Sequence, residues 1–423
     1  MSKANDPSLK SWVPVPVGSD FPIQNLPFGI FKTNNSEPRI GVAIGESVLD
    51  LSALAASGLF YAIAFDKSVF SQSSLNSFIA LGKTITNAVR ERISDLLNIN
   101  NQELQGNDAL KSKVLIKQSD AQMLMPVQVP NYTDFYSSRE HATNVGAMFR
   151  DPANALLPNW LHLPVGYHGR ASSIVVSGTA IHRPKGQTKT DAEPMPSFGP
   201  SKSLDFELEL AFITGKATAL GDSITTAQAD DYIFGMVLFN DWSARDLQRW
   251  EYVPLGPFLA KNFGSTISPW VVTLEALEPF RVEGPVQDPE VLPYLKYSGK
   301  KNYEINLEVA IETPNCVGKT VSQSNFKYMY WNMAQQLAHH TVNGCNISVG
   351  DMYASGTISG PTADSYGSML EITWGGKNPV QMPDGTERKF INDNDTVVMK
   401  GYAERNGVRI GFGECSGKIL PSK

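Results

Sequence analysis

Cysteine is scarce in this chain of 423 residues, and long hydrophobic runs are missing. The three cysteines, Cys316, Cys345 and Cys415, lie far apart and form no C-x-x-C pair, which argues against a disulfide framework and a zinc site. The most apolar stretch, residues 233–239, is too short to cross a bilayer, and no apolar signal segment opens the chain. We therefore expect a cytoplasmic protein with no membrane partner.

Positive charge is also sparse. The chain has 36 Lys and Arg residues against 42 Asp and Glu residues, and it has no basic block along which a phosphate backbone could lie. Nucleic acid is therefore not an expected partner. With 42% hydrophobic residues the chain can bury a sizeable core, and its length predicts two or three domains.

The first part of the chain predicts a small β domain that ends in a helix. Residues 39–51 form two short apolar runs around a central Gly-Glu-Ser, which is typical of a β-hairpin. From Ser77 onward, apolar residues recur at spacings of three and four, as in an amphipathic helix. A polar stretch at residues 98–118 follows, so we expect a boundary near residue 120 and domains at 1–120 and 121–423.

The longer second part predicts a mostly β fold. Short apolar or alternating runs are expected to be strands at residues 173–176, 204–213, 233–239, 270–274, 303–311, 369–374 and 396–402. Helices are expected only at about 135–148, 222–232, 242–250 and 325–340. Because these helices do not alternate regularly with strands, the predicted fold class is mainly β (α+β), with a β-rich sandwich or roll as the larger domain.

Familiar nucleophile and metal motifs are missing. The chain lacks G-x-S-x-G, H-E-x-x-H and G-x-x-x-x-G-K-[ST], so serine hydrolase, zincin and P-loop functions have no support. His339 and His340 are neighbours in an expected helix, where adjacent side chains point about 100° apart and cannot share a ligand. We expect a structural role for that pair.

The run of residues 204–210 (LDFELEL) alternates between acidic and apolar side chains. In a strand this alternation places Asp205, Glu207 and Glu209 on one face. One interpretation is a half-buried strand with a solvated acidic face. The other is a Ca²⁺ or Mg²⁺ site, because carboxylates on one face repel each other unless a cation or a proton intervenes.

Asp241 could join such a site, because it follows the apolar strand expected at residues 233–239. In a helix beginning there, one face would carry Asp241, Arg245, Gln248 and Tyr252. The loop beyond adds the cation of Lys261 and the hydroxyl of Ser265. A surface helix with mixed polar residues would show the same spacing.

Asp134 precedes an expected helix, and we expect Asp134, Ser138 and His141 to fall on one side of it. The chain has only six histidines, and His141 beside an acid is the best candidate for a general base, although a lone histidine is commonly structural. Arg150 follows an apolar run and could bind an anion, but a surface arginine would look the same.

Several longer segments occur in order along the chain. They are residues 20–29 (DFPIQNLPFG), 134–144 (DFYSSREHATN), 158–164 (PNWLHLP), 167–170 (YHGR), 205–209 (DFELE), 240–246 (NDWSARD) and 355–360 (SGTISG). Together they closely resemble the fumarylacetoacetate hydrolase family, and the resemblance covers nearly the whole chain.

The resemblance implies hydrolysis of 4-fumarylacetoacetate to fumarate and acetoacetate, the last step of tyrosine and phenylalanine catabolism, by a homodimer. It implies a small N-terminal SH3-like barrel domain before the larger catalytic domain. Carried over by position, the implied Ca²⁺ ligands are Asp134, Glu207, Glu209 and Asp241. The implied Mg²⁺ neighbourhood is Asp241, Lys261 and Ser265, and the family more usually has Thr in place of Ser265.

By the same resemblance His141 is the implied proton acceptor, oriented by Glu371. The implied substrate contacts are Tyr136, Arg150, Gln248, Tyr252 and Thr357. Hydrolysis of a carbon–carbon bond in a 1,3-diketone requires a nucleophile at neutral pH, a stabilised oxyanion and a stabilised enolate. Water activated by His141 would supply the first, donors from Arg245, Gln248 and Lys261 the second, and the cation the third as a Lewis acid.

Two alternatives stay open at this point. Another enzyme of the same superfamily, such as a 2-oxoacid decarboxylase, hydratase or isomerase, would also use a cation held by carboxylates. A non-catalytic Ca²⁺-binding β module would need the acidic residues but not His141. The pairing of His141 with Glu371 and the full N-terminal domain favour the hydrolase.

Overall fold

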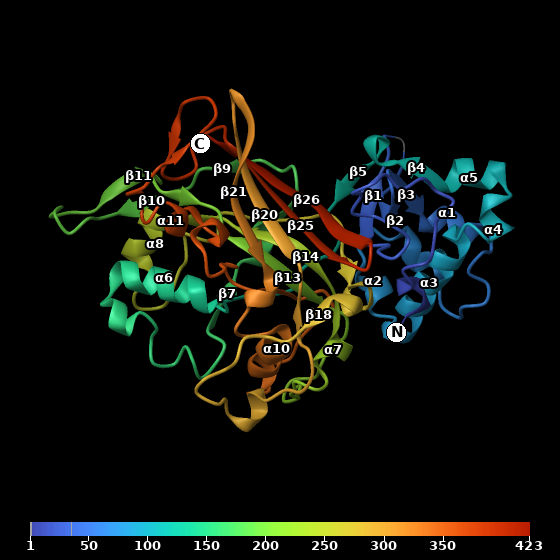
Figure 1. The fold of residues 1–423 in the computed structure, drawn as a ribbon, viewed down its shortest axis with the longest axis horizontal. Coiled ribbons are helices and arrows are strands. Elements are labelled where there is room, and N and C mark those ends of the chain that lie inside the picture. The colour runs from blue at the N-terminus through green and yellow to red at the C-terminus, as the bar shows by residue number, and fades with distance from the viewer. Residues whose placement is uncertain (1, 35) are drawn as a thin grey trace.

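The computed structural model describes residues 2–34 and 36–423. Its N-terminal domain lies at one end of a larger β-rich body (Figure 1). This domain is built on an open sheet in the order β4-β3-β2-β1-β5, from β1 (Phe28–Lys32), β2 (Arg39–Ile44), β3 (Ser47–Asp50), β4 (Leu115–Lys117) and β5 (Gln122–Leu124). Its helices are α1 (Leu51–Ala56), α2 (Asn76–Ile79), α3 (Lys83–Leu97), α4 (Gln102–Gln105) and α5 (Asp108–Val114).

The expected hairpin and amphipathic helix of the N-terminal domain are both present. β2 pairs with β3 around the turn at Gly45, and α3 buries Val89, Ile93, Leu96 and Leu97 against the domain core. The polar stretch at residues 98–118 is folded, because α4, α5 and β4 lie within it. β5 pairs with β1, so the sheet reaches residue 124, and the boundary near residue 120 stays a prediction.

The body contains two large sheets. The eight-stranded sheet runs in the order β7-β6-β22-β13-β14-β16-β8, with β17 beside β14, and the five-stranded sheet runs β21-β20-β25-β26-β9. The strands of the first are β6 (Tyr132–Phe135), β7 (Gly166–Gly169), β8 (Ile174–Val176), β13 (Leu208–Thr214), β14 (Ile233–Asp241), β16 (Ser265–Ile267), β17 (Val272–Thr273) and β22 (Met352–Ala354). Those of the second are β9 (Ile181–His182), β20 (Asn306–Thr313), β21 (Cys316–Asn325), β25 (Thr396–Arg405) and β26 (Val408–Leu420).

Short strand pairs and helices complete the body. The pairs are β10 (Lys185–Thr188) with β11 (Ser197–Pro200), β12 (Leu204–Asp205) with β15 (Ser243–Ala244), β18 (Arg281–Val282) with β19 (Asn302–Tyr303), and β23 (Val380–Gln381) with β24 (Glu387–Arg388). The helices are α6 (Arg139–Phe149), α7 (Ala229–Tyr232), α8 (Arg245–Glu251), α9 (Leu274–Leu277), α10 (Met333–Thr341) and α11 (Met369–Ile372). Figure 1 shows α6, α8 and the β10–β11 hairpin at the end of the body remote from the N-terminal domain.

Strands β13 and β14 lie between two hydrophobic cores. Alternate residues of β13, Leu208, Leu210 and Phe212, belong to the core that also contains side chains of β20, β25 and β26. Ala211 and Ile213 belong instead to the core shared with the N-terminal domain. Because successive side chains of a strand point to opposite faces, the central sheet is covered on both sides. Its strands are therefore a rigid support for side chains at their ends.

Residues 369–374 were expected to form a strand, and that expectation is wrong. Residues 369–372 form helix α11, which is capped by Ser368. The backbone N–H groups of Met369 and Leu370 donate to the carboxylate of Asp205, 2.7 and 3.0 Å away. These distant partners satisfy the first turn of the helix, and the local apolar pattern does not reveal them.

The mainly β fold class is confirmed. A half-barrel sheet forms the N-terminal domain, and a larger β-rich domain follows it. Within residues 2–34 and 36–423, every helix is too short or too polar to span a membrane.

Candidate active site

Four buried carboxylates meet at the ends of neighbouring strands. Asp134 belongs to β6, Glu207 directly precedes β13, Glu209 lies within β13, and Asp241 is the last residue of β14. One oxygen from each lies within 4.8 Å of the others. The structure therefore brings together the four residues implied as cation ligands, and the solvated acidic face is ruled out because none is more than 6% exposed.

Two cations are the main counter-charges of this cluster. Lys261 donates from Nζ to Asp241, 2.7 Å away, and to Glu207. Arg245 Nη1 lies 2.8 Å from Glu207 Oε1. Burial opposes ionisation of Glu207, but the charges of Lys261, Arg245 and His141 outweigh it and lower the pKa of Glu207 to about 2. Burial would lower the pKa of Lys261, yet Asp241 and Glu207 raise it above the ordinary lysine value.

The other two carboxylates lack such compensation. Burial, followed by the charge of Asp241, raises the pKa of Asp134 well above its usual range. Burial, followed by the charges of Asp134 and Asp241, does the same to the pKa of Glu209. Among the residues that the structure describes, Asp134 Oδ1 and Glu209 Oε1 are buried without any hydrogen-bond partner. Buried oxygens of this kind are unusual, because buried polar atoms are generally paired.

These features fit a divalent cation. When ionised, the four carboxylates outnumber the two cationic side chains, so the cluster retains two negative charges. Hard carboxylate oxygens at this spacing are the ligands that Ca²⁺ and Mg²⁺ prefer. The residues that could hold the ion are Asp134, Glu207, Glu209 and Asp241, and the two unpaired oxygens are open to it.

Asp205 does not join the carboxylate cluster, although alternation placed it on the same face as Glu207. The chain leaves the strand at Phe206: β12 pairs with β15, whereas β13 pairs with β14 and β22. Asp205 Oδ2 accepts instead from Arg245 Nε, 2.8 Å away. The expected helical face from Asp241 to Tyr252 is also interrupted, because Asp241 ends a strand and α8 begins at Arg245.

A histidine and a carboxylate form a buried pair next to the cluster. His141 Nδ1 lies 2.6 Å from Glu371 Oε2, and the side chains are 4% and 0% exposed. Burial opposes ionisation of Glu371, but His141 and the hydrogen bonds from Asn144 and Ser359 lower its pKa. Because an ionised carboxylate only accepts, Nδ1 carries the proton and Nε2 is left to accept one.

The first turn of α6 positions this histidine. Ser138 caps the helix by accepting from the backbone N–H of His141, and it donates to Ser359 O, 3.1 Å away. The helix begins at Arg139 and not near residue 135, so Asp134 lies in β6 and does not share a helical face with Ser138 and His141 as expected. The ring of Tyr136 packs edge-on against His141, with ring centroids 5.3 Å apart.

The residues implied as substrate contacts are only partly gathered here. Gln248 Oε1 accepts from Arg245 Nη1, 3.2 Å away, and Thr357 is buried in the loop after β22. Tyr252 is 53% exposed beyond α8, and Arg150 is exposed beyond α6, where it donates to Ala155 O. In the described part of the chain, neither side chain hydrogen-bonds to the carboxylate cluster.

Sequence reasoning gave no role to several polar residues of the site. The hydroxyl of Tyr167 lies 3.0 Å from Asp134 Oδ2 and 2.8 Å from Asp241 Oδ2, so it bridges two carboxylates. Asn144, Ser359 and Ser368 all donate to Glu371. Tyr167 and Asn144 lie inside segments that resemble the family, and this was the only signal that could have identified them.

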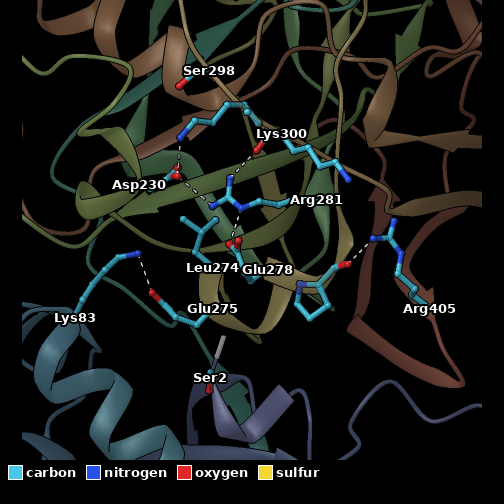
Figure 2. Close-up of a pocket in the computed structure, with 13 residues that line it drawn as sticks. Ser2, Lys83, Asp230, Leu274, Glu275, Glu278, Arg281, Ser298, Lys300 and Arg405 are labelled. Carbon is cyan, nitrogen blue, oxygen red and sulfur yellow. Dashed lines mark hydrogen bonds and ion pairs between the residues drawn. The ribbon is translucent and has the colours of Figure 1, made fainter. Parts of the chain in front are cut away.

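A cleft of about 660 Å³ lies elsewhere, between the N-terminal domain and the body (Figure 2). Lys83 of α3 pairs with Glu275 of α9 at 2.8 Å across it. Arg281 pairs with Glu278 at 2.6 Å and with Asp230 at 3.2 Å. The Lys83–Glu275 pair therefore joins the N-terminal domain to the body across this cleft.

Comparison with known families matches both parts of the chain. The model described as fumarylacetoacetate (FAA) hydrolase C-terminal matches residues 131–420. The model described as fumarylacetoacetase N-terminal matches residues 24–126.

Similar proteins align over almost their whole length. A fumarylacetoacetase of Dictyostelium discoideum is 56% identical over 98% of both chains. A fumarylacetoacetase of Caenorhabditis elegans is 55% identical over 98% of this chain and all of its own. The fumarylacetoacetase of Homo sapiens is 52% identical over 97% of this chain and 99% of its own.

Solved structures share the fold at low sequence identity. A fumarylacetoacetate hydrolase from psychrophilic Exiguobacterium antarcticum has a TM-score of 0.52 at 18% identity, covering 94% of this chain and 99% of its own. The family models, the full-length relatives and the buried metal-type cluster agree. This chain belongs to the fumarylacetoacetate hydrolase family.

Proposed function

We propose that this chain hydrolyses 4-fumarylacetoacetate to fumarate and acetoacetate, and so acts at the end of tyrosine and phenylalanine catabolism. The observation that carries the proposal is the buried pair of His141 and Glu371 directly beside the carboxylate cluster. A binding module would have no use for a general base at this place. Full-length relatives that are fumarylacetoacetases support the choice of substrate.

His141 is the proposed base that activates water. Its Nδ1 proton is held by Glu371, so Nε2 accepts the proton that water loses as it attacks the carbonyl. Glu371 is itself fixed by Asn144, Ser359 and Ser368, which keeps the imidazole in one orientation. Water is the proposed nucleophile because, among the described residues, the imidazole ring of His141 hydrogen-bonds to Glu371 and to no Ser or Cys side chain.

Arg245, Gln248 and Lys261 are the proposed donors to the oxyanion. Among the described residues Arg245 Nη2 is buried without a partner, although its other two nitrogens are engaged. A guanidinium N–H held in this way is available to a negative charge that develops during the reaction. Lys261 is held in place by Glu207 and Asp241, so its position is fixed before substrate arrives.

We propose Ca²⁺ at Asp134, Glu207, Glu209 and Asp241, and Mg²⁺ near Asp241, Lys261 and Ser265. The carboxylate count and the unpaired oxygens support the first site. At the second, Ser265 Oγ donates to Asp241 Oδ1, 3.0 Å away, and the Lys261 ammonium neutralises carboxylates. A bound divalent cation would polarise the diketone oxygens and stabilise the departing enolate.

The proposed substrate contacts are Tyr136, Arg150, Gln248, Tyr252 and Thr357. Arg150 lies close enough to Tyr136 for its charge to act on that phenol, and a guanidinium is suited to a terminal carboxylate of the substrate. The phenol of Tyr136 lies beside His141, where it can orient a polar oxygen of the substrate.

We further propose a cytoplasmic homodimer. β11 and α8 lie at the end of the body remote from the N-terminal domain (Figure 1). Large apolar side chains are exposed on β11, on α8 and in the segment that follows α8: Phe198, Trp250, Tyr252, Val253, Leu255 and Phe258. Exposed apolar groups gathered in this way are typical of a surface that associates. The three free cysteines suit a reducing compartment. Light scattering during gel filtration should give twice the chain mass of 46.3 kDa, and a single-chain mass would contradict the dimer.

The direct test is turnover of fumarylacetoacetate by the purified protein. We expect its ultraviolet absorbance to decay, one fumarate to appear for each substrate consumed, and a chelator to abolish both. If folded, cation-loaded protein leaves the substrate intact, the proposed function is wrong, and 2-oxoacid substrates should be tested. If fumarate still forms stoichiometrically in the presence of chelator, only the proposed role of the cation is contradicted, and the proposed reaction stands.

A further inference from the structure

Asp205 is a fully buried carboxylate that lies outside the carboxylate cluster. In the part of the chain that the structure describes, its three partners are all hydrogen-bond donors. Oδ2 accepts from Arg245 Nε at 2.8 Å and from the backbone N–H of Leu370 at 3.0 Å. Oδ1 accepts from the backbone N–H of Met369 at 2.7 Å. One carboxylate therefore joins two elements that are far apart in the chain.

The first element carries the proposed oxyanion donor. Asp205 holds Arg245 through Nε, while Nη1 donates to Glu207 and to Gln248. These contacts fix the plane of the guanidinium and leave Nη2 free of any partner in the described chain. Without Asp205 the guanidinium could rotate about its last bond, because the remaining contacts engage only one of its nitrogens.

The second element carries the partner of the proposed base. Met369 and Leu370 open α11, the short helix that contains Glu371. Glu371 in turn holds His141 at 2.6 Å. A helix of a single turn has few internal hydrogen bonds, so its orientation depends on the groups that accept from its first N–H groups.

We infer that Asp205 is a positioning residue, which sets Arg245 and the Glu371–His141 pair in one fixed relation to each other. The inference rests on the proposed function, because the groups it aligns are the base and the oxyanion donor. To act on the same substrate carbonyl, the base His141 and the donor Arg245 must be placed relative to each other to within about half an ångström. A carboxylate is required at this position because all its partners donate. An amide in its place would face at least one donor with its own N–H₂ group.

A purely stabilising role is the competing explanation, and the chain offers a matched control. Asp395 is likewise fully buried and pairs with Arg388 through Nε at 2.7 Å and Nη2 at 2.9 Å. It also accepts from the backbone N–H of Asn392 at 2.9 Å. Asp395 contacts neither α11 nor the carboxylate cluster within the described ranges. Asp395→Asn therefore reproduces the loss of a buried ion pair without touching the site.

The experiment compares Asp205→Asn with Asp395→Asn in the full-length, cation-loaded enzyme, at a temperature where both are folded. Both variants should unfold at lower temperature than the wild type. Asp205→Asn should lose about 100-fold in kcat with KM within threefold, whereas Asp395→Asn should keep kcat within twofold. In the double variant Asp205→Asn/Arg245→Gln, the loss should fall well short of the product of the two single losses.

Retention of wild-type kcat by Asp205→Asn, or losses that multiply in the double variant, would overturn the inference. Absence of turnover in the wild type would instead refute the proposed function.

If Asp205→Asn does not fold, Met369→Pro and Met369→Ala replace it. Both remove the same side chain, but only proline removes the N–H that donates to Asp205, and the backbone of Ser368 is already extended as a proline requires. Met369→Pro should then have about tenfold lower kcat than Met369→Ala, and equal kcat values would count against Asp205.

Discussion

Glu209 is the residue at which stability and cation binding conflict most directly. It is fully buried, and within the described ranges its Oε2 accepts one hydrogen bond, from the backbone N–H of Gly356, 3.0 Å away. Its Oε1 finds no partner among the described residues. Burial and the neighbouring Asp134 and Asp241 raise its pKa well above the usual range. The cation-free protein therefore keeps a carboxyl group where an uncharged side chain would be more stable.

Replacing Glu209 by glutamine should have opposite effects on stability and binding. We expect the unfolding free energy of cation-free protein to rise by about 1 to 3 kcal/mol, because a buried carboxyl among carboxylates is removed. Calcium affinity should fall at least tenfold, because one charged ligand is lost. Urea denaturation in chelator and calorimetric titration measure the two effects. The exposed Glu46→Gln serves as control, and a fall in both quantities would contradict the explanation.

His141→Ala tests the base without disturbing the cation. His141 is not one of the four proposed cation ligands, so the calcium affinity of the variant should remain within twofold of wild type. Removing a general base should lower kcat by about 10²- to 10⁴-fold. Steady-state kinetics and calcium titration of the same preparation give both values. The exposed His162→Ala should behave as wild type, and full activity of His141→Ala would rule out the assigned base.

At the scale of single elements, the loop after β22 depends on one glycine. Gly356 has φ of +76°, and a Cβ there would lie 2.2 Å from the carbonyl oxygen of Phe135. The loop therefore passes directly against β6, the strand that carries Asp134. The backbone N–H of Gly356 reaches Glu209 because a residue without a Cβ lets the loop approach β6 this closely.

Gly356→Ala should destabilise the protein by about 3 kcal/mol or more, and it should weaken cation binding. Gly407, in the β25–β26 turn, is the matched control. Its φ is +75°, but a Cβ there meets no atom within 4 Å in the described structure. Gly407→Ala should therefore cost only about 1 kcal/mol, from backbone strain alone. Equal costs in urea denaturation would show that the contact with Phe135 is unimportant.

Helix α10 carries a histidine whose burial makes stability depend on pH. His340 packs edge-on against Tyr353, with ring centroids 5.0 Å apart. Burial, with smaller effects from His168 and His339, lowers the pKa of His340 from 6.5 to about 4. The unfolded chain thus binds a proton that the folded protein does not accept between these pH values. The contribution of His340 to the free energy of unfolding is therefore fully present above pH 6.5 and is lost as the pH falls toward 4.

His340→Gln should reduce this loss of stability in acid. Partial exposure of the ring to solvent limits its contribution to about 1 to 2 kcal/mol between pH 7 and 4. Urea denaturation at several pH values measures it, and the exposed His162→Gln should keep the wild-type dependence. An unchanged slope in His340→Gln would assign the acid sensitivity to other groups.

On the scale of the whole molecule, the N-terminal domain and the body share a hydrophobic core. Phe78 of α2 lies 5.0 Å from Phe28 and 6.3 Å from Phe234, measured between ring centroids. Phe28 belongs to the N-terminal sheet and Phe234 to β14, the strand that ends at Asp241. The same core thus supports both the N-terminal sheet and a strand of the candidate site, so we expect both parts to unfold together.

Phe78→Ala tests this coupling. Deleting a buried aromatic ring should cost about 3 to 5 kcal/mol and shift a single calorimetric transition to lower temperature. Turnover should disappear over the same temperature range, although Phe78 belongs to the N-terminal domain. Tyr61→Ala, which removes an 83% exposed ring, should leave the transition in place. Two separate transitions, with activity surviving the first, would show that the domains unfold independently.

The sequence by itself determined the chemistry of the site and the kind of fold. Alternation within residues 204–210 and the apolar strand before Asp241 indicated strands that carry acids, but a solvated acidic face and a cation site both remained open. These signals are local, because side-chain period and turn residues are written in neighbouring positions. The family resemblance supplied His141 and Glu371 as partners, which lie 230 residues apart.

Tertiary structure alone decided how these residues are divided between tasks. Asp205 and Glu207 are two positions apart in one alternating run, yet β12 pairs with β15 while β13 pairs with β14 and β22. Asp205 therefore accepts hydrogen bonds from Arg245 and from the first residues of α11, whereas Glu207 pairs with Lys261 in the carboxylate cluster. α11 is a helix and not a strand because distant acceptors satisfy its first N–H groups. Hydrogen bonds between segments this far apart leave no periodic trace in the sequence, so only the folded chain could show them.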